Sequence, residues 1–384
     1  MSEVAPQKSL RVLHIASEKT WRGGENQIRL LMEGMKSRGH EPFLAADPAS
    51  AILSRLGQTF PSVAVSMARL SWGLTVLRLH RFCQRHGIFL IDAHSSKAHD
   101  LGLGLVFLDQ RRKLVVHRRV DYPVGGGFLS AAPTTAIKYR TKKVARYVAI
   151  SRAIAKVLEA GGIAPERIAT VRSAVESGPH ENINRDEARR SLRTLLGLSS
   201  NSLLFGNASA LSEQKGYGYL MAASALLKDN QIDFHCVIAG DGPQRDQLEA
   251  QRIDLQLDNH VSFLGFIKEV PEFLAGLDIF VMTSIDEGLG TAALDACHAG
   301  CAMIVSDVGG LPEIVSHENS GLLVPIRDPA AIAAAMTRLA RDSALRDRLA
   351  RAGQIKVRQE FSVASMVEGN LAVYRDVISV GYGQ

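Results

Sequence analysis

The chain has 384 residues, 46% of them hydrophobic and 22% charged, which is typical of a soluble globular protein. No apolar run approaches the roughly 18 residues of a membrane-spanning helix, and the first ten residues lack the apolar core of a secretory signal, so we expect a cytoplasmic protein. Its length predicts two domains, each with its own core, and the formal net charge is +6.

The charge is divided unevenly along the chain. Residues 1–172 hold 27 Lys and Arg against 12 Asp and Glu, a net +15, and the remainder holds 18 against 27, a net −9. A front half this basic predicts attraction to an anionic surface such as a membrane leaflet, with a solvated basic face as the alternative. Residues 138–146 (KYRTKKVAR) are our candidate contact. Nucleic acid is disfavoured because aromatic residues are not interleaved with the basic ones.

The first 172 residues alternate between apolar β-branched runs and segments of helical periodicity. A helix should follow the first strand and end near Gly39. This alternation predicts a doubly wound parallel sheet, an α/β Rossmann-like domain. The predicted strands are 10–17, 41–46, 88–96, 113–120 and 145–151.

The alternation of predicted strands and helices stops at residues 173–199. This segment is polar and turn-rich, and we place the interdomain connection there. A second α/β series follows in 200–361, so the same architecture is expected twice, with the two sheets facing each other across a cleft. The helical segment 362–384 could pack on either domain, including back on the first. The strands predicted in the second series are 202–209, 233–242, 260–266, 277–284, 302–308 and 321–326.

Ligands of parallel α/β sheets bind beyond the carboxyl ends of the strands, so the turns there are informative. After the strand at 277–284, Glu287 lies in a turn and a helix should begin near Gly290. The unpaired amides and dipole of a helix start favour phosphate or hydroxyl groups, and Gly288 and Gly290 permit close approach. Asp295, one turn on, could hold a ribose diol. The alternative is a glycine-rich turn whose acids cap the helix.

Four further turns should lie on the same rim. Lys215 and Gly216 follow a strand, where the ammonium could neutralise a pyrophosphate. The turns after two other strands offer backbone and apolar surfaces that could sandwich a base. A Gly-Gly pair lies in the turn after a further strand. Each of these turns could equally be a plain turn without a ligand. The residues concerned are Gly240, Gly242, Leu264, Phe266, Gly309 and Gly310.

In the first half, Gly23 and Gly24 follow the first strand, where their amides could face a phosphate or an acceptor. Their spacing is not that of a dinucleotide fingerprint, so NAD binding is disfavoured. Histidines and arginines follow other strands and could position an acceptor and screen phosphates, although lone histidines are usually structural. These residues are His94, His99, His117, Arg118, Arg119 and Asp121.

Cys297 and Cys301 lie four residues apart. No histidine or acidic pair at ligand spacing accompanies them, so we expect buried thiols rather than a metal site.

In order and spacing, these motifs resemble those of retaining glycosyltransferases of the GT-B fold, specifically glycosyltransferase family 4, over essentially the whole chain. The family pattern has two glutamates separated by seven residues. Glu287 matches the first, near the transferred sugar, and Asp295 holds the second position, on the ribose. The arginine usual five or six residues before the lysine is absent, because Ser209 and Ala210 stand there.

Lys215 would then act on the diphosphate with the amides of Gly288, Leu289, Gly290 and Thr291, helped by a first-domain arginine such as Arg118 or Arg119. His117 is the match to a family histidine.

The resemblance implies transfer of a sugar from a nucleoside diphosphate donor, UDP- or GDP-linked, to an acceptor hydroxyl with retention at the anomeric carbon. It implies no cofactor and no metal, since lysine and helix amides replace a cation. The expected acceptor is a cell-envelope glycan or glycolipid, as in lipopolysaccharide synthesis, which would place the enzyme at the inner face of the cytoplasmic membrane. The alternatives are a nucleotide-sugar epimerase of the same fold and a catalytically silent sugar-nucleotide binding protein.

Overall fold

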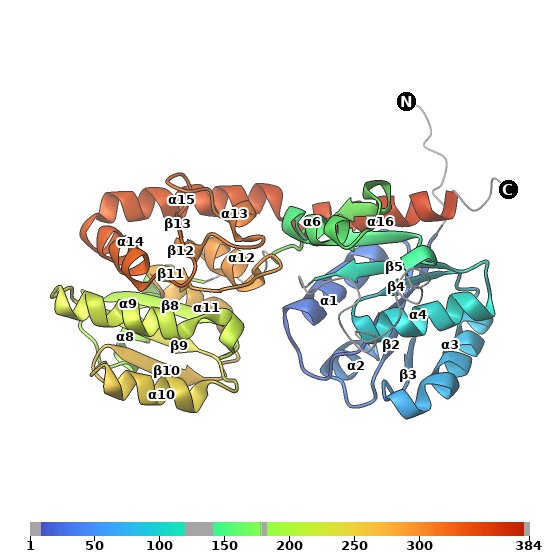
Figure 1. The fold of residues 1–384 in the computed structure, drawn as a ribbon, viewed down its shortest axis with the longest axis horizontal. Helices are drawn as coiled ribbons and strands as arrows, with labels where there is room; N and C mark the ends of the chain where they lie inside the picture. Colours follow the sequence, from blue (N-terminus) through green and yellow to red (C-terminus); the bar gives the residue numbers. More distant parts are fainter. Residues whose placement is uncertain (1–8, 120–140, 177, 179–182, 380–384) are drawn as a thin grey trace. The chain divides into compact units, whose positions relative to one another are not determined.

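The computed structural model describes residues 9–119, 141–176, 178 and 183–379, and the chain divides into two compact units (Figure 1). Unit 1 comprises Met1–Ser173 and Val363–Gln384, and unit 2 comprises Ala174–Ser362. Each is built on a parallel sheet with helices, which confirms the two predicted Rossmann-like domains. Element numbers follow Figure 1.

The sheet of unit 1 has seven strands in the order β3-β2-β1-β4-β5-β6-β7, with every pair parallel. β1 is buried from its second residue onward, as its continuous apolar run predicts. The short edge strands β3 and β7 were not predicted. The strands are β1 Arg11–Ala16, β2 Glu41–Ala46, β3 Ser62–Ala64, β4 Leu90–Ala93, β5 Lys113–Arg118, β6 Arg146–Ala149 and β7 Ile168–Thr170.

The helices of unit 1 come from both ends of the chain. They are α1 Gly23–Lys36, α2 Ala51–Leu56, α3 Trp72–His86, α4 Ser96–Leu108, α6 Arg152–Ala160 and α16 Val363–Ser379, with 3-10 turns η1 Arg69–Ser71 and η2 Pro165–Arg167. The C-terminal helix α16 packs on α1, where a Cβ added to Gly34 would lie 2.4 Å from Val367 Cγ2. An ion pair of 2.7 Å joins Arg38 to Glu368 beside this contact.

The sheet of unit 2 has six parallel strands in the order β10-β9-β8-β11-β12-β13. The strands are β8 Leu203–Ala208, β9 Phe234–Ala239, β10 Val261–Gly265, β11 Ile279–Met282, β12 Ala302–Ser306 and β13 Leu322–Val324. The helices are α8 Arg185–Leu195, α9 Tyr217–Asp229, α10 Arg245–Asp254, α11 Val270–Gly276, α12 Thr291–His298, α13 Leu311–Ile314, α14 Pro329–Arg341 and α15 Ser343–Glu360, with the 3-10 turn η3 Glu213–Lys215.

Helix α8 lies within the segment 173–199, which the sequence suggested as a connection, but it belongs to the body of unit 2. It packs on α11, where the absent side chain of Gly276 leaves room for Leu192. Arg193 on the same helix is buried and pairs with Asp278 at 2.6 Å, just before β11. The connection therefore contains a structural element of the second domain.

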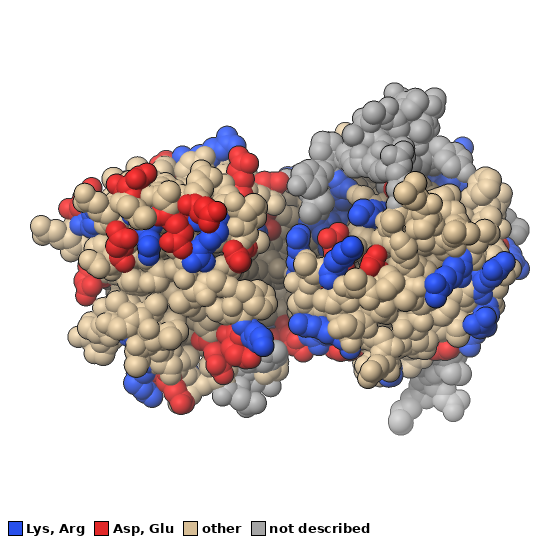
Figure 2. Space-filling view, turned by 90° about the horizontal axis from the view of Figure 1, so that it is seen from below, with Lys and Arg blue, Asp and Glu red and all other residues tan. Residues whose placement is uncertain are grey.

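The uneven charge of the sequence is visible on the surface. On the face drawn in Figure 2, acidic side chains are frequent over unit 2, whereas Lys and Arg predominate over unit 1. Within the residues that the structure describes, no helix combines the length and apolar character needed to cross a bilayer. Of the basic segment 138–146, residues 138–140 lie outside the described residues.

Each sheet has one point at which the strand order reverses. In unit 1 the chain moves outward from β1 on one side and from β4 on the other, and in unit 2 from β8 and β11. The turns that follow such neighbouring strands diverge and leave space beyond the sheet edge, where ligands of this class of fold bind. The predicted site residues cluster at these two points.

Candidate active site

At the reversal point of unit 2, Lys215 meets Glu287. Lys215 ends the turn after β8, Glu287 lies in the turn after β11, and their Nζ and Oε2 atoms are 2.5 Å apart. Both side chains are mostly shielded, with 18% and 12% of their surface exposed. The sequence predicted both residues at this edge, and the structure adds that they form an ion pair.

Backbone contacts hold the two turns together. The amide of Ile285 donates to the Gln214 carbonyl at 2.9 Å, and Gln214 Nε2 donates to the Asp286 carbonyl at 3.1 Å. Gly216 has a positive φ of 63°, and a Cβ there would lie 2.2 Å from the Thr283 carbonyl oxygen. Only glycine permits this approach, which places Lys215 beside Glu287.

The Gly-Gly pair after β12 supports the turn of Glu287 from the other side. The amide of Gly310 donates to the Glu287 carbonyl at 3.1 Å. Gly309 has φ 56°, and a Cβ on it would lie 1.7 Å from that same carbonyl oxygen. A Cβ on Gly310 would lie 2.5 Å from the Gly288 carbonyl oxygen. The pair, which the sequence placed in a turn on this rim, therefore supports and fixes the backbone of Glu287.

Helix α12 begins at this turn without a side-chain cap. Its N-cap is Gly290, with φ 94°, which has no side chain that could cap the helix. The side chain of Leu289 is buried in the core, so this residue can offer only its backbone. An uncapped helix start carries partial positive charge and free donors. The anion-binding segment that the sequence predicted, Gly288–Thr291, thus lies at this helix start and follows Glu287 directly in the chain.

Asp295 lies in the second turn of α12, at the position that the sequence suggested for ribose binding. Burial first, and then the nearby Glu176 carboxylate, raise the pKa of Asp295 to about 7. Near neutral pH this group is therefore divided between a carboxylate that accepts hydrogen bonds and an acid that can also donate one.

The shift predicts a measurable change in stability for Asp295→Asn. An unfolded Asp ionises near pH 4, so between about pH 4 and 7 the folded protein binds an extra proton. Ionisation of Asp295 therefore destabilises the folded protein. This penalty is absent below about pH 4 and complete above about pH 7. We expect Asp295→Asn to raise the melting temperature by several degrees more at pH 8 than at pH 4. A gain independent of pH would contradict the assignment, and the exposed Asp254→Asn is the control.

The remaining donor-side residues line the turns after β9 and β10. Gly240, with φ 136°, and Gly242 pack against the backbone of Ser209 and Leu211, where a Cβ would lie 2.0 and 2.4 Å from the respective carbonyl oxygens. These glycines shape the turn after β8 in addition to any ligand contact. Phe266 is 79% exposed, so its ring is available to a planar ligand, and Leu264 is half-buried beside it in the chain.

At the reversal point of unit 1, a buried carboxylate that the sequence reading did not single out, Asp92, is the centre of a polar cluster. His14, His94 and His117 place a ring nitrogen 3.3, 3.2 and 3.1 Å from Asp92 Oδ2, and Tyr374 from α16 donates its hydroxyl to the same oxygen. The signal in the sequence was a charged residue within an otherwise apolar strand.

Burial opposes ionisation of Asp92, but the histidines and their hydrogen bonds outweigh it and hold its pKa well below the usual range. Burial lowers the pKa of His94 to about 3 and also lowers that of His117. Burial, then the charge of Asp92, raise the pKa of Tyr374 well above its usual value. The cluster therefore surrounds one carboxylate with the neutral rings of His94 and His117 and with the Tyr374 hydroxyl, which donates to it.

Arg119 connects this cluster to the start of α1. Arg119 Nη2 lies 3.3 Å from His94 Nδ1, and its Cδ is 3.6 Å from the position of a Cβ on Gly24. Gly23 begins α1 and is exposed, and Arg118 ends β5 with its side chain half-buried. The predicted residues of unit 1 thus gather at one edge of its sheet. Asp121 lies outside the described residues.

Two sets of side chains bear on metal binding. His14, Asp92 and His94 have ligand atoms within 4.8 Å of one another and could hold a metal ion by distance alone. The guanidinium of Arg119, however, lies against His94 and would repel a cation there. Cys297 and Cys301 are free and buried, which confirms the interpretation as thiols, and burial raises their pKa values to about 12 and 11.

Comparison with known proteins agrees with this fold. The family described as Glycosyltransferase Family 4 matches residues 21–177, and the family described as Glycosyl transferases group 1 matches residues 189–356. Two parallel sheets of this kind, each covered by helices, form the GT-B glycosyltransferase fold. The chain belongs to glycosyltransferase family 4.

Among curated relatives, the lipopolysaccharide core biosynthesis glycosyltransferase LpsD of Rhizobium meliloti is 32% identical over 162 residues, 42% of this chain and 46% of that protein. The 2-deoxystreptamine glucosyltransferase of Streptomyces kanamyceticus is 29% identical over 249 residues, 64% of each chain. The chain thus spans about half to two thirds of the length of these relatives. The crystal structure of Anabaena HepE with UDP and glucose aligns with a TM-score of 0.82 at 21% identity, covering 96% of this chain and 100% of HepE, and shows the shared fold.

Proposed function

We propose that this protein is a retaining glycosyltransferase that moves a sugar from a nucleoside diphosphate donor to an acceptor hydroxyl in the synthesis of a cell-envelope glycan. The observation that carries the proposal is the Lys215–Glu287 pair beside the uncapped start of α12. Relatives named for lipopolysaccharide and amylovoran synthesis support the substrate class. HepE, which shares the fold, was crystallised with UDP-glucose, which supports a nucleotide-sugar donor.

The chemistry follows from the charges at this edge. Breaking the bond between the sugar and the diphosphate leaves negative charge on the phosphate. A lysine ammonium and helix amides that already point to that position stabilise this charge without reorganising. Glu287, on the adjacent turn, can accept hydrogen bonds from sugar hydroxyls. The leaving phosphate can then take the acceptor proton on the same face, so this scheme needs neither a metal ion nor a protein nucleophile.

Product analysis tests this proposal. We expect donor consumption to depend on an added glycan or glycolipid acceptor, in a panel of UDP- and GDP-sugars, and the anomeric proton of the product to keep the donor configuration in NMR spectra. A rearranged free sugar formed without acceptor would instead identify an epimerase. Binding without turnover of any donor would identify a silent sugar-nucleotide binding protein.

We also propose that unit 1 carries the enzyme to an anionic membrane surface, on its cytoplasmic side. The support is an exposed face of α3 and α4, which pack together where Gly104 lies against Val76 and Trp72. Large apolar side chains are exposed here: Leu70, Trp72, Leu74, Leu77, Phe107 and Leu108. Arg78, Arg81 and Arg85 continue the exposed side of α3, which contains no acidic residue. Apolar and cationic side chains on one helix are typical of interfacial binding.

Flotation with liposomes tests the membrane surface. Each basic residue near an anionic leaflet contributes roughly 1 kcal/mol, and buried apolar side chains add to this. We expect the protein to float with phosphatidylglycerol vesicles and the variant Leu74→Gln/Phe107→Gln to lose most of this binding. The control is Leu195→Gln, an equally exposed leucine on α8. Equal recovery with neutral vesicles, or an unaffected double variant, would contradict the proposal.

A further inference from the structure

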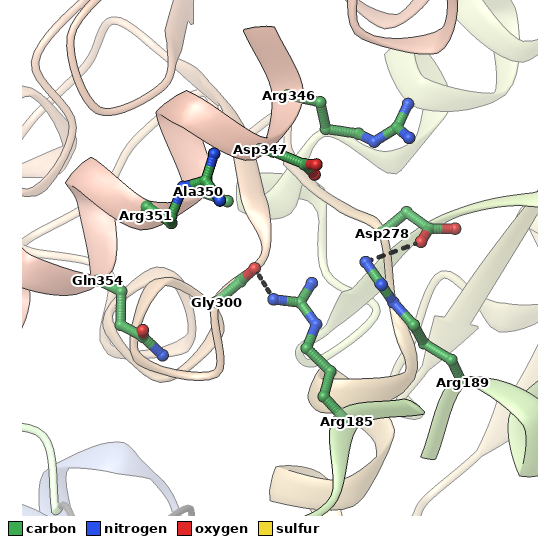
Figure 3. Close-up of a pocket in the computed structure, with 9 residues that line it drawn as sticks. All are labelled: Arg185, Arg189, Asp278, Gly300, Arg346, Asp347, Ala350, Arg351 and Gln354. Carbon is green, nitrogen blue, oxygen red and sulfur yellow. Dashed lines mark hydrogen bonds and ion pairs between the residues drawn. The ribbon is translucent and has the colours of Figure 1, made fainter. Parts of the chain in front are cut away.

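A second cluster of positive charge lies in unit 2, around a pocket of about 150 Å³ between α8 and α15 (Figure 3). Arg185 and Arg189 reach it from α8, and Arg346 and Arg351 from α15. Asp278 and Asp347 are the carboxylates in its lining. This pocket is separate from the candidate donor site: Gly300, which lines it, follows the end of α12, whereas Glu287 and the segment Gly288–Thr291 lie at the start of that helix.

One of the two carboxylates is already neutralised. Asp278 Oδ1 accepts from Arg189 at 3.1 Å, and its Oδ2 accepts from Arg193 at 2.6 Å and from the Leu204 amide at 2.9 Å. This leaves Asp347 as the single carboxylate to offset Arg185, Arg346 and Arg351. Like charges confined around one pocket repel each other, so the lining is short of negative charge.

Several arginine donors at the pocket have no acceptor. The Nε groups of Arg185, Arg189 and Arg346 are buried and make no hydrogen bond. The remaining nitrogens of Arg185 donate to the carbonyls of Gly300 and Leu277, and Arg346 donates to Leu339 at 2.8 Å, so the backbone already orients these side chains. Buried donors normally have partners, so an acceptor bound in this pocket would satisfy three Nε groups that have none within the described residues.

A tetrahedral oxyanion suits this lining in charge and geometry. Guanidinium groups present planar pairs of donors that match phosphate oxygens, and several of them can contact one phosphate from different sides. The volume exceeds that needed for a single water molecule. Burial lowers the pKa of Arg185, and the positive charge of the neighbouring Arg189 lowers it further. A bound anion would offset this unfavourable electrostatic environment.

We propose that the pocket between α8 and α15 binds a phosphate group, as the free ion or as a phosphate monoester, independently of the candidate donor site. Arg346 and Arg351 are the principal ligands, because neither forms an ion pair within the described residues, whereas Arg189 is paired with Asp278 and two nitrogens of Arg185 donate to backbone carbonyls. Arg351 is exposed and forms no ion pair with the described part of the chain. Asp347 weakens the site by placing a negative charge within it.

Calorimetric titration of the full chain with inorganic phosphate, at constant ionic strength in chloride, tests this site. The titrations use a Lys215→Met background so that phosphate binding at the donor site is weakened and contributes less. We expect Arg351→Gln and Arg346→Gln each to weaken binding about tenfold, the effect of one charge-assisted hydrogen bond. Asp347→Asn should strengthen binding. Arg358→Gln, which removes an exposed charge from the same helix outside the pocket, should leave it unchanged.

A parallel titration with glycerol phosphate distinguishes the source of the phosphate group. Tighter binding than that of inorganic phosphate would assign the pocket to a monoester, and equal or weaker binding to the free ion. Absence of saturable binding, or equal affinity in the parent, Arg346→Gln and Arg351→Gln proteins, would overturn the proposal. Circular dichroism of each variant shows that a loss does not come from unfolding, and Asp347→Asn supplies a gain that unfolding cannot imitate.

Discussion

Replacing Lys215 by methionine is expected to lower kcat for sugar transfer by about 10²–10³-fold, the usual cost of losing one oriented charge at a developing oxyanion. The ammonium lies 2.5 Å from Glu287 and beside the uncapped start of α12, so the variant leaves the diphosphate with helix amides alone. Affinity for UDP or GDP should also fall. Steady-state kinetics with the active donor, and calorimetry with the nucleotide, measure the two effects.

The partner in the ion pair should behave differently. Because Glu287 occupies Lys215 when no ligand is present, Glu287→Gln removes a competitor of the diphosphate. We expect this variant to bind the free nucleotide at least as tightly as the parent, but to lose transfer because its sugar contact is weakened. Lys228→Met, at the far end of α9, is the matched control and should retain activity. Equal kinetics of Lys215→Met and Lys228→Met would refute a role for Lys215.

Substituting Gly309 by alanine is expected to reduce transfer at least as strongly as losing a side chain at the site. The new Cβ would lie 1.7 Å from the Glu287 carbonyl oxygen, and backbone on both sides limits how far either turn can move. Glu287 would therefore be displaced, and a displacement of about 1 Å can cost on the order of 10²-fold in rate. Activity and thermal unfolding should be measured together.

The variant Gly197→Ala distinguishes the effect of this clash on activity from the effect of backbone strain on stability. Gly197 has φ 66°, close to the 56° of Gly309, but nothing lies within 4 Å of its added Cβ. Both variants place alanine in the left-handed region and should lose about 1 kcal/mol of stability for that reason. Only Gly309→Ala should lose activity as well. Similar activity in the two variants would show that the Gly-Gly pair does not position Glu287.

Much of this arrangement could be predicted from local sequence. Buried apolar runs marked the long strands, and glycine-rich turns after them marked both sheet edges. Lys215 and Glu287 were both expected at the edge of the second sheet, but their contact was not, because it depends on β8 lying next to β11, strands far apart in the chain. Strand order is a property of the fold that no local pattern contains.

Other features depended on packing. Asp92 was hidden within a strand, and its partners include residues of two other strands, β1 and β5, and of α16 at the far end of the chain. Gly309 supports the backbone of Glu287 by packing against the Glu287 carbonyl, which belongs to a different turn. The arginine pocket combines a helix within the expected connection with α15, so neither segment alone indicated a site. Such sites arise where separate elements converge, and sequence spacing cannot reveal them.

A crystal structure of the protein with UDP or GDP tests the central claim most directly. We predict that the diphosphate lies within hydrogen-bonding distance of Lys215 Nζ and of backbone amides in Gly288–Thr291, with the Lys215–Glu287 pair opened or shared. A nucleotide bound in the arginine pocket or elsewhere, with Lys215 still paired to Glu287 and the α12 start without ligand, would contradict this account.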